Sequence, residues 1–254
     1  MIELKELKKS YQSNCVIDNL STTIAKGKLT AIIGPNGSGK STLLSLLSGL
    51  MSPDSGEVCL EEQSLLDYPK ESLAKKLAFL KQSNQLSLKM TVKELVSFGR
   101  FPYSRGRLDK TDKYVIEQSL ADMELLSLSD RYIDQLSGGQ LQRAFIAMIL
   151  AQDTDYILLD EPLNNLDLKH SVQLMILLRR LVKERQKTII FVIHDINFAS
   201  HYSDQILAMK AGKLIAHGNT ENLLTERLLK ELFDFPIAIE TVNQRKFCVY
   251  YDLD

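Results

Sequence analysis

The chain has 254 residues, of which 44% are hydrophobic and 25% charged, the composition of a globular protein able to bury a sizeable core. Its 31 Lys and Arg nearly balance its 32 Asp and Glu. No overall basic field therefore favours nucleic acid as a partner.

The first eight residues, Met1 to Lys8, alternate apolar and charged side chains. This pattern indicates a half-buried strand and not the apolar stretch of a signal peptide, so we expect a cytoplasmic protein. The apolar run from Leu43 to Met51 is much shorter than the roughly 18 residues of a membrane helix and contains Ser and Gly. If the protein serves a membrane, other chains are expected to span it.

Short segments at the start of the chain are predicted to form antiparallel strands that flank the core: Ile2–Leu7, Leu20–Ile24 and Glu57–Leu60. Three further apolar runs are rich in β-branched residues, as is typical of strands buried on both faces of a parallel sheet. These runs are 29–33, 156–159 and 188–193, with helices expected at 41–50 and 168–184.

Between about residues 91 and 151, apolar residues recur at three-to-four-residue spacing, which predicts a helical insert without strands. The basic residues Arg100, Arg105, Arg107 and Lys110 are expected in a solvated loop, or alternatively at lipid headgroups or a permease.

After Gly218, leucines at helical spacing predict two short helices with Thr220 and Thr225 as N-caps. Two closing strands are predicted at Ala238–Val242 and Lys246–Tyr251. No function is assigned to this tail.

A glycine-rich loop follows the predicted strand at 29–33 and opens a helix, which is the context that a P-loop requires. Its residues are Gly34, Pro35, Asn36, Gly37, Ser38, Gly39, Lys40, Ser41 and Thr42. Glycines let the backbone wrap a polyphosphate so that successive N–H groups face its oxygens. Lys40 adds a positive charge at the terminal phosphates, and the Ser41 hydroxyl is a candidate ligand of Mg²⁺.

The predicted strand at 156–159 ends in two adjacent carboxylates, Asp160 and Glu161. Such a pair at the edge of a core is costly unless a cation or a reaction uses it. We expect Asp160 to serve Mg²⁺ and Glu161 to orient or deprotonate the water that attacks the γ-phosphate.

A second candidate anion site lies at Leu136-Ser137-Gly138-Gly139-Gln140, just before a helical pattern. Taken alone, Ser-Gly-Gly indicates only a turn. Because it follows the P-loop and precedes the acidic pair in the chain, however, this pentapeptide resembles the signature motif of the ABC ATPase family.

The resemblance covers essentially the whole chain and implies roles for single residues. Tyr11 matches the aromatic residue that stacks on adenine, and Gln82 the glutamine that senses Mg²⁺ and the attacking water. Asp167 belongs to the segment that crosses the dimer interface, the D-loop, although residues 163–165 depart from the commoner Thr-Ser-Ala wording. His194 matches the switch histidine that contacts the γ-phosphate. His170, His201 and His217 are expected to be structural.

The implied fold is α/β, a P-loop NTPase (RecA-like) core with an antiparallel β subdomain and an inserted helical subdomain. Residues 1–254 would form a single ABC ATPase domain. The core, the β subdomain and the C-terminal tail would take about 1–88 and 152–254, and the helical subdomain with the signature about 89–151.

The family's mechanism implies that ATP and Mg²⁺ are bound by a head-to-tail dimer. Each ATP would lie between one chain's P-loop and the other chain's Ser137, Gly138, Gly139 and Gln140. Lys40, Gln82, Glu161 and His194 would be the catalytic residues, and Ser41, Gln82 and Asp160 would serve the metal. The implied partners are membrane permease subunits docked near Gln82 and, indirectly, an extracytoplasmic substrate-binding protein.

Residues 91–103 resemble a segment found in the ATPases of iron-siderophore, haem and cobalamin importers. Residues 166–170 and 194–199 point the same way and resemble most closely the bacterial iron-siderophore ATPases. The resemblance implies an importer ATPase at the cytoplasmic face of the membrane. Haem or cobalamin as cargo, an exporter, and a non-transport ABC ATPase remain alternatives, because nothing in the predicted ATP site recognises a cargo.

Overall fold

The structure is a computed structural model that describes residues 1–82, 89–242 and 245–250. The chain divides into two compact units. The first unit combines Met1–Tyr68 with Thr188–Asp254, and the second is Pro69–Lys187.

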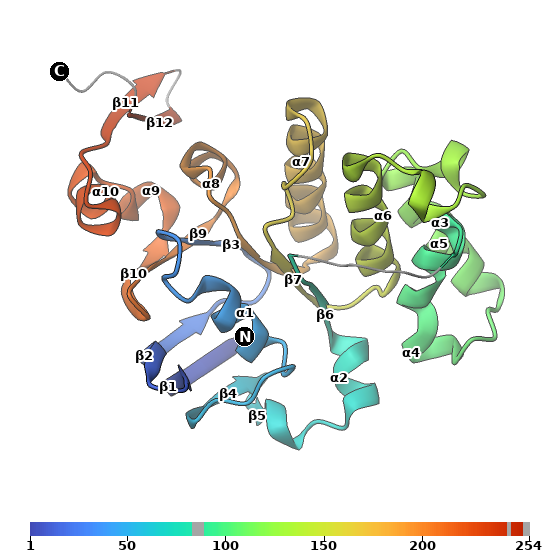
Figure 1. Ribbon diagram of the computed structural model, residues 1–254, viewed down its shortest axis with the longest axis horizontal. Coiled ribbons are helices and arrows are strands. Elements are labelled where there is room, and N and C mark those ends of the chain that lie inside the picture. Colours follow the sequence, from blue (N-terminus) through green and yellow to red (C-terminus); the bar gives the residue numbers. More distant parts are fainter. Residues whose placement is uncertain (83–88, 243–244, 251–254) are drawn as a thin grey trace. The chain divides into compact units, whose positions relative to one another are not determined.

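An antiparallel sheet opens the first unit, with strand order β2-β1-β4-β5 (Figure 1). Its strands are β1 (Ile2–Tyr11), β2 (Asn14–Ile24), β4 (Ser55–Leu60) and β5 (Gln63–Ser64). The three antiparallel strands predicted near the N-terminus are confirmed, and β1 and β2 extend further than predicted. Leu4 and Leu7 are both buried because a register shift lies between them, where Glu6 has a left-handed φ of 48°.

The first unit also carries four strands of a second sheet, in the order β10-β9-β3-β8. They are β3 (Leu29–Ile33), β8 (Thr188–Val192), β9 (Gln205–Lys210) and β10 (Lys213–Asn219). β3 runs parallel to both β8 and β9, and every residue of β3 and β8 is buried, as their apolar composition predicts. Helix α1 (Lys40–Leu47) follows β3.

The C-terminal part of the first unit holds three helices and a hairpin (Figure 1). They are α8 (Ile196–Tyr202), α9 (Thr220–Leu223), α10 (Glu226–Phe233), β11 (Ala238–Val242) and β12 (Arg245–Val249). Thr225 caps α10 as predicted, but Asn219 and not Thr220 caps α9, because the Asn219 side chain accepts from the Glu221 N–H at 3.0 Å. Tyr251, where the second closing strand was predicted to end, lies outside the described residues.

The second unit contains a pair of parallel strands, β6 (Leu77–Leu80) and β7 (Tyr156–Asp160). Its helices are α2 (Lys70–Lys76), α3 (Val92–Ser97), α4 (Phe101–Ser104), α5 (Lys110–Asp122), α6 (Gly138–Ala151) and α7 (Leu168–Arg185). Short 3₁₀ turns lie at Leu65–Asp67 in the first unit and at Phe98–Arg100, Leu126–Leu128 and Ile133–Gln135 in the second.

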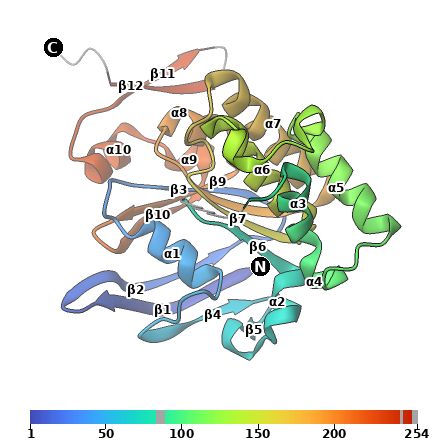
Figure 2. The same ribbon diagram turned by 45° about the vertical axis from the view of Figure 1, so that its right-hand side comes forward.

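The predicted insert is helical: α3, α5 and α6 pack against one another (Figure 2). Among the described residues from 91 to 151, strand pairing is limited to one isolated bridge between Thr91 and Tyr132. None of the helices in the described part of the chain has the length and apolar character needed to cross a membrane.

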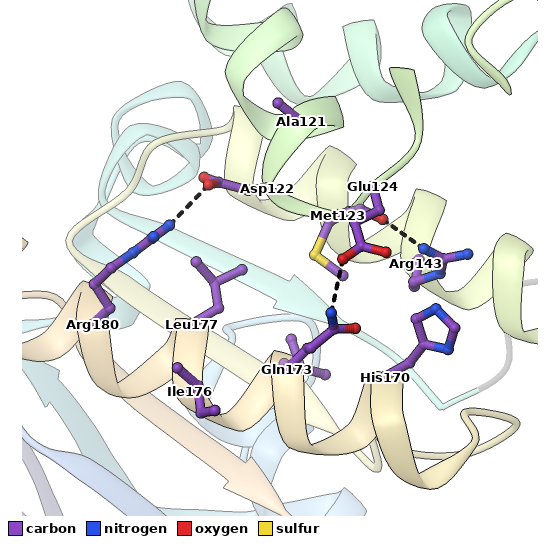
Figure 3. Close-up of a pocket in the computed structure, with 11 residues that line it drawn as sticks. Ala121, Asp122, Met123, Glu124, Arg143, His170, Gln173, Ile176, Leu177 and Arg180 are labelled. Atoms are coloured by element: carbon purple, nitrogen blue, oxygen red, sulfur yellow. Dashed lines mark hydrogen bonds and ion pairs between the residues drawn. The ribbon is translucent and has the colours of Figure 1, made fainter. Parts of the chain in front are cut away.

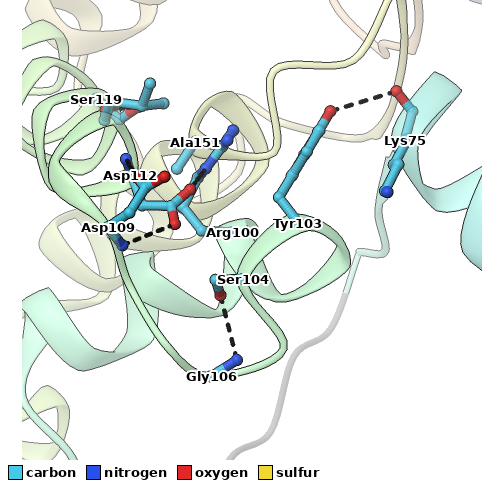
Figure 4. A network of polar contacts seen from close by, with 10 residues as sticks. Lys75, Arg100, Tyr103, Ser104, Gly106, Asp109, Asp112, Ser119 and Ala151 are labelled. Atoms are coloured by element: carbon cyan, nitrogen blue, oxygen red, sulfur yellow. Dashed lines mark hydrogen bonds and ion pairs between the residues drawn. The ribbon is translucent and has the colours of Figure 1, made fainter.

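A buried ion pair ties this helical region together (Figure 4). Arg100 Nε donates to Asp112 Oδ1 at 2.8 Å, and its Nη1 donates to the Ala151 carbonyl at 2.9 Å. The guanidinium also lies 4.0 Å from the centre of the Tyr103 ring. Arg100 therefore links the starts of α4 and α5 to the end of α6. The solvated-loop prediction is wrong for this residue, which is 6% exposed, and holds for Arg105, which is exposed.

We predict that Arg100→Ala destabilises the protein by about 3–5 kcal/mol, because the Asp112 carboxylate would stay buried without its partner. Arg105→Ala is the control. It breaks an exposed pair with Glu71 at 2.8 Å and should cost at most about 1 kcal/mol. Urea unfolding measures both changes, and equal losses would contradict the prediction.

The same pair predicts a pH dependence. Burial alone would raise the pKa of Asp112. Hydrogen bonds from Arg100 and from the Asp109 backbone together outweigh burial, so the pKa of the Asp112 carboxyl lies below its usual range. The Arg100–Asp112 pair therefore contributes fully to the free energy of unfolding above the pKa that Asp112 has in the unfolded chain. This contribution is lost as the pH falls through the lower pKa that Asp112 has in the folded protein. The stability gap between wild type and Arg100→Ala should narrow below about pH 4.

Candidate functional site

In the first unit, two predicted site segments begin at the same edge of the sheet. β3 and β8 are parallel with Ile32 beside Val192, and the Ile193 N–H donates to the Ile32 carbonyl at 3.3 Å. The chain then enters the glycine-rich loop after β3 and reaches His194, which is exposed, after β8. The carboxyl ends of parallel strands are where α/β proteins bind their ligands.

The loop from Gly34 to Gly39 depends on glycine for two different reasons. A Cβ at Gly34 would lie 2.0 Å from the Met209 carbonyl oxygen, and one at Gly39 would lie 2.6 Å from that of Val16. Gly37 meets nothing within 4 Å, but its φ is +76°. The loop thus packs closely against the protein at its two ends, while its middle leaves backbone facing open space.

Two side chains inside the loop fit an anionic ligand. Lys40 is only 6% exposed, and its Nζ donates to the carbonyls of Gly34 and Pro35 at 2.9 and 2.8 Å. The Ser38 hydroxyl is buried and has no hydrogen-bond partner among the described residues. A buried ammonium, a buried hydroxyl without a partner and the N-terminus of α1 together suit the oxygens of a polyphosphate.

In the second unit, β6 and β7 are parallel with Leu80 beside Leu159, so Gln82 and the acidic pair follow at one edge. Asp160 is 2% exposed at the end of β7. Glu161 adopts a left-handed φ of 51° and its Oε2 accepts a 2.6 Å hydrogen bond from Gln82 Nε2. The structure therefore brings the two predicted catalytic residues of this unit together.

Asn164 is a site residue that the sequence reasoning did not identify. Its Nδ2 donates to Glu161 Oε2 at 2.5 Å, and its backbone N–H donates to the Glu161 carbonyl at 3.2 Å. The only signal in the sequence was that Leu163-Asn164-Asn165 departs from the Thr-Ser-Ala that is commoner in the family. Asn164 and Gln82 together hold the orientation of the Glu161 carboxylate.

The predicted second anion site forms the start of α6. Ser137 is the N-cap, and Ser137 and Gln140 exchange hydrogen bonds of 3.3 and 3.0 Å in a capping box. A Cβ at Gly139 would lie 2.8 Å from the Asn165 carbonyl, and Gln142 Nε2 donates to the Pro162 carbonyl at 3.2 Å. The signature segment therefore contacts the loop that follows Glu161.

Asp167 caps α7 and accepts hydrogen bonds from the backbone and the ring of His170 at 2.8 and 2.7 Å. These bonds hold the pKa of the Asp167 carboxyl below its usual range. Tyr11 is 48% exposed at the end of β1, and its hydroxyl contacts Met51 Sδ at 3.3 Å. Its stacking on adenine stays a prediction.

A pocket of about 310 Å³ lies between the end of α5 and α7 (Figure 3). Gln173 donates to Glu124 and Arg180 to Asp122, each at 2.8 Å. None of the predicted site residues is among its described lining residues. These pairs join α7 to the helical region.

A glycine-rich loop that follows a buried strand and carries a buried lysine is the mark of a P-loop nucleotide-binding protein. The pair of carboxylates at the end of another buried strand agrees with this class. The ABC transporter family matches residues 17–164, more than half of the chain. The chain therefore belongs to the ABC transporter family. As a member of that family, it is an ATPase.

Two relatives match over nearly their whole length. The Petrobactin import ATP-binding protein YclP of Bacillus subtilis (strain 168) is 53% identical over 99% of this chain and 100% of its own. The Petrobactin import ATP-binding protein FatE of Bacillus anthracis is 46% identical over 94% and 96%.

Solved structures agree on the fold. A dimeric ATP-binding cassette in a post-hydrolysis state with ADP and Pi matches with a TM-score of 0.79 at 33% identity, covering 87% of this chain and 99% of the other. A putative metal-chelate type ABC transporter in an inward-facing conformation matches with a TM-score of 0.83 at 28% identity, covering 100% and 97%. The predicted fold class is confirmed.

We predict that Lys40→Ala weakens ATP binding at least about tenfold, because charge-assisted hydrogen bonds to phosphate contribute about 1.5–3 kcal/mol. Lys110→Ala, which removes an exposed lysine at the start of α5, is the matched control and should leave affinity unchanged. Isothermal titration with ATP measures both. Circular dichroism checks folding, since Lys40 also bonds the loop itself. Unchanged affinity in the folded Lys40 variant would contradict the assignment.

Proposed function

We propose that this chain is the ATP-hydrolysing subunit of an ABC importer that drives uptake of an iron-siderophore complex through a separate membrane permease. The observation that carries the proposal is its end-to-end match, at 53% identity, to a petrobactin import ATP-binding protein. Other relatives are named for iron(3+)-hydroxamate and ferric enterobactin, at 39% and 38% identity. The shared property is iron bound by a siderophore, so the proposal is made for that class of cargo.

The nucleotide is assigned to the glycine-rich loop. Backbone N–H groups of the loop and of the start of α1 would hold phosphate oxygens, and the Ser38 hydroxyl would gain the partner that it lacks. Lys40 would move its donors from the carbonyls of Gly34 and Pro35 to the terminal phosphates. Tyr11 is assigned to the adenine.

Mg²⁺ is assigned to Ser41, Asp160 and Gln82. A hydroxyl, a carboxylate and an amide oxygen are the hard oxygen ligands that this ion takes. When bound, it would neutralise charge on the phosphates.

Hydrolysis is assigned to Glu161 as the general base. Its carboxylate would accept a proton from the attacking water while the γ-phosphate leaves ADP as inorganic phosphate. Gln82 and Asn164 support this role because both donate to the Glu161 carboxylate. His194 is assigned to the γ-phosphate.

The working form would be a head-to-tail dimer. Each chain carries two candidate anion-binding elements, the start of α1 and the start of α6, which the family's mechanism pairs across a dimer. Ser137, Gly138, Gly139 and Gln140 of one chain would therefore close on the ATP of its partner, and Asp167 would lie at their interface. The dimeric cassette with ADP and Pi supports this arrangement.

The remaining partners follow from the importer assignment. The chain would sit at the cytoplasmic face of the membrane, bound to permease subunits, with an extracytoplasmic substrate-binding protein delivering the cargo. ATP binding would close the dimer and hydrolysis would release it, so that the motion reaches the permease.

We predict that Glu161→Gln lowers the rate of ATP hydrolysis about 10²–10⁴-fold, because the amide cannot accept the proton. The amide oxygen can still accept from Gln82 and Asn164, so the local geometry should persist. Because bound ATP would bridge two chains, the variant should become an ATP-dependent dimer in size-exclusion chromatography with light scattering.

Asp160→Asn is the matched control for this experiment. It makes the same carboxylate-to-amide change one residue earlier, at the proposed metal ligand, and should not trap a dimer because it weakens the Mg-ATP complex itself. A Glu161→Gln protein that stays monomeric at saturating Mg-ATP, or that turns over normally, would remove Glu161 from the role of base.

The cargo proposal is tested by uptake of radioactive iron into cells that lack this chain. We expect uptake of iron bound to one siderophore class, such as petrobactin, to be lost, because the permease would have no ATPase to drive it. Wild-type chain should restore it and Lys40→Ala should not. Unchanged uptake of every iron-siderophore together with lost uptake of haem or cobalamin would assign the chain to that cargo instead.

A further inference from the structure

The C-terminal hairpin of β11 and β12 has no part in the ATP site proposed above. Its strands pair in register, with Ile239 beside Cys248. The hairpin lies against α8, in the same unit (Figure 2). Helix α8 begins two residues after His194.

One side chain makes the central contact between hairpin and helix. Asn197 Oδ1 accepts from the Cys248 N–H at 2.8 Å, and Asn197 Nδ2 donates to the Cys248 carbonyl at 3.2 Å. The amide thus reproduces the two bonds that a residue of a neighbouring strand would exchange with Cys248. A primary amide carries this donor and acceptor side by side on one planar group.

Further contacts of β12 lie next to the one made by Asn197. The His201 ring contacts Arg245, and Ser200 Oγ, which donates to the Asn197 carbonyl at 2.9 Å, lies 3.4 Å from the Lys246 carbonyl oxygen. Lys246 Nζ donates to the carbonyls at Glu221 and Leu224, at 2.7 and 3.1 Å. β12 is therefore held to α8 and to the end of α9.

Asn197 is also bound on its backbone side. The Asp195 carboxylate caps α8 by accepting from the N–H groups of Asn197 and Phe198 at 2.8 and 3.1 Å. Burial, and next the negative charge of Asp195, raise the pKa of the Cys248 thiol to about 11, which agrees with a hairpin seated close to this cap. The turn that carries His194 is thus fixed at one end by β8 and at the other by a helix start that the hairpin holds.

We propose that Asn197 is a positioning residue, through which the C-terminal hairpin fixes the start of α8 and so sets the place of His194 for ATP hydrolysis. The proposal rests on the role of His194 given under Proposed function. It assigns the tail a role in turnover and none in nucleotide affinity.

The contact itself is tested first, without reference to ATP. In Asn197→Ala the buried Cys248 should react with iodoacetamide about tenfold faster, since both hydrogen bonds that hold the Cys248 backbone against α8 are lost. The same full-length chain supplies both references: Cys15 is exposed and should react fast in either protein, and Cys59, buried in β4, should stay slow. Unchanged reactivity of Cys248 would overturn the proposal.

The effect on turnover is tested next. Asn197→Ala should lower kcat about three- to tenfold, within the range of a misplaced catalytic group, and leave the KM for ATP within about twofold. Tyr68→Phe is the matched control. It removes the 2.9 Å hydrogen bond from the Tyr68 hydroxyl to the Leu60 carbonyl, at the antiparallel sheet of the same unit, and should keep the wild-type kcat. A kcat that falls equally in both variants would mean general destabilisation and overturn the proposal.

A double variant separates this inference from the proposed function. In a His194→Ala background, Asn197→Ala should cause no further loss, because it acts through His194. If the kcat of the double variant falls by the product of the two single-variant losses, the positioning role of Asn197 is overturned, while the proposed catalytic role of His194 stands. A His194→Ala protein with normal kcat would remove the proposed role of His194 and this inference with it. If Asn197→Ala does not fold, Asn197→Asp, which keeps only the acceptor for the Cys248 N–H, should give intermediate values in both tests.

Discussion

Parallel strand pairing is the constraint on which both halves of the candidate site depend. β3 and β8 end together in the first unit, and β6 and β7 end together in the second. Neighbouring parallel strands end at the same edge of a sheet. The residues that follow them therefore lie close together although they are far apart in the sequence. The P-loop and His194 share one such edge, and Gln82 and Glu161 share the other. The buried strands fix the positions, and the polar residues that follow them supply the chemistry.

Carboxamide side chains set the finer geometry around these edges. Gln82 and Asn164 orient the Glu161 carboxylate. Gln142 joins α6 to the loop after β7, and Asn197 joins α8 to the hairpin. An uncharged amide offers a donor and an acceptor without the desolvation cost of an ion. That property suits it to hold a charged group in place without changing the local charge.

Much of the fold follows from local patterns. Short apolar runs predicted β3, β7 and β8, and the glycine-rich segment after β3 predicted the loop, because buried strands and tight turns each restrict residue type. The contacts of Arg100, Asn164 and Asn197 were not predicted. The partners of Arg100 and Asn197 lie on other elements, whereas Asn164 bonds Glu161 within one loop. In each case a polar residue has the same local sequence pattern whether it faces water or bonds another group. The roles of the site residues in binding and hydrolysis stay predictions until the variants are measured.

The left-handed backbone of Glu161 has a consequence for how this protein responds to selection in the laboratory. A residue with a Cβ pays about 1–3 kcal/mol to hold that conformation, and glycine does not. The folded state is thus strained at the residue assigned to proton transfer. Glycine at that position would relieve the backbone strain but remove the carboxylate, so any variant that a screen for heat resistance selected there would be inactive.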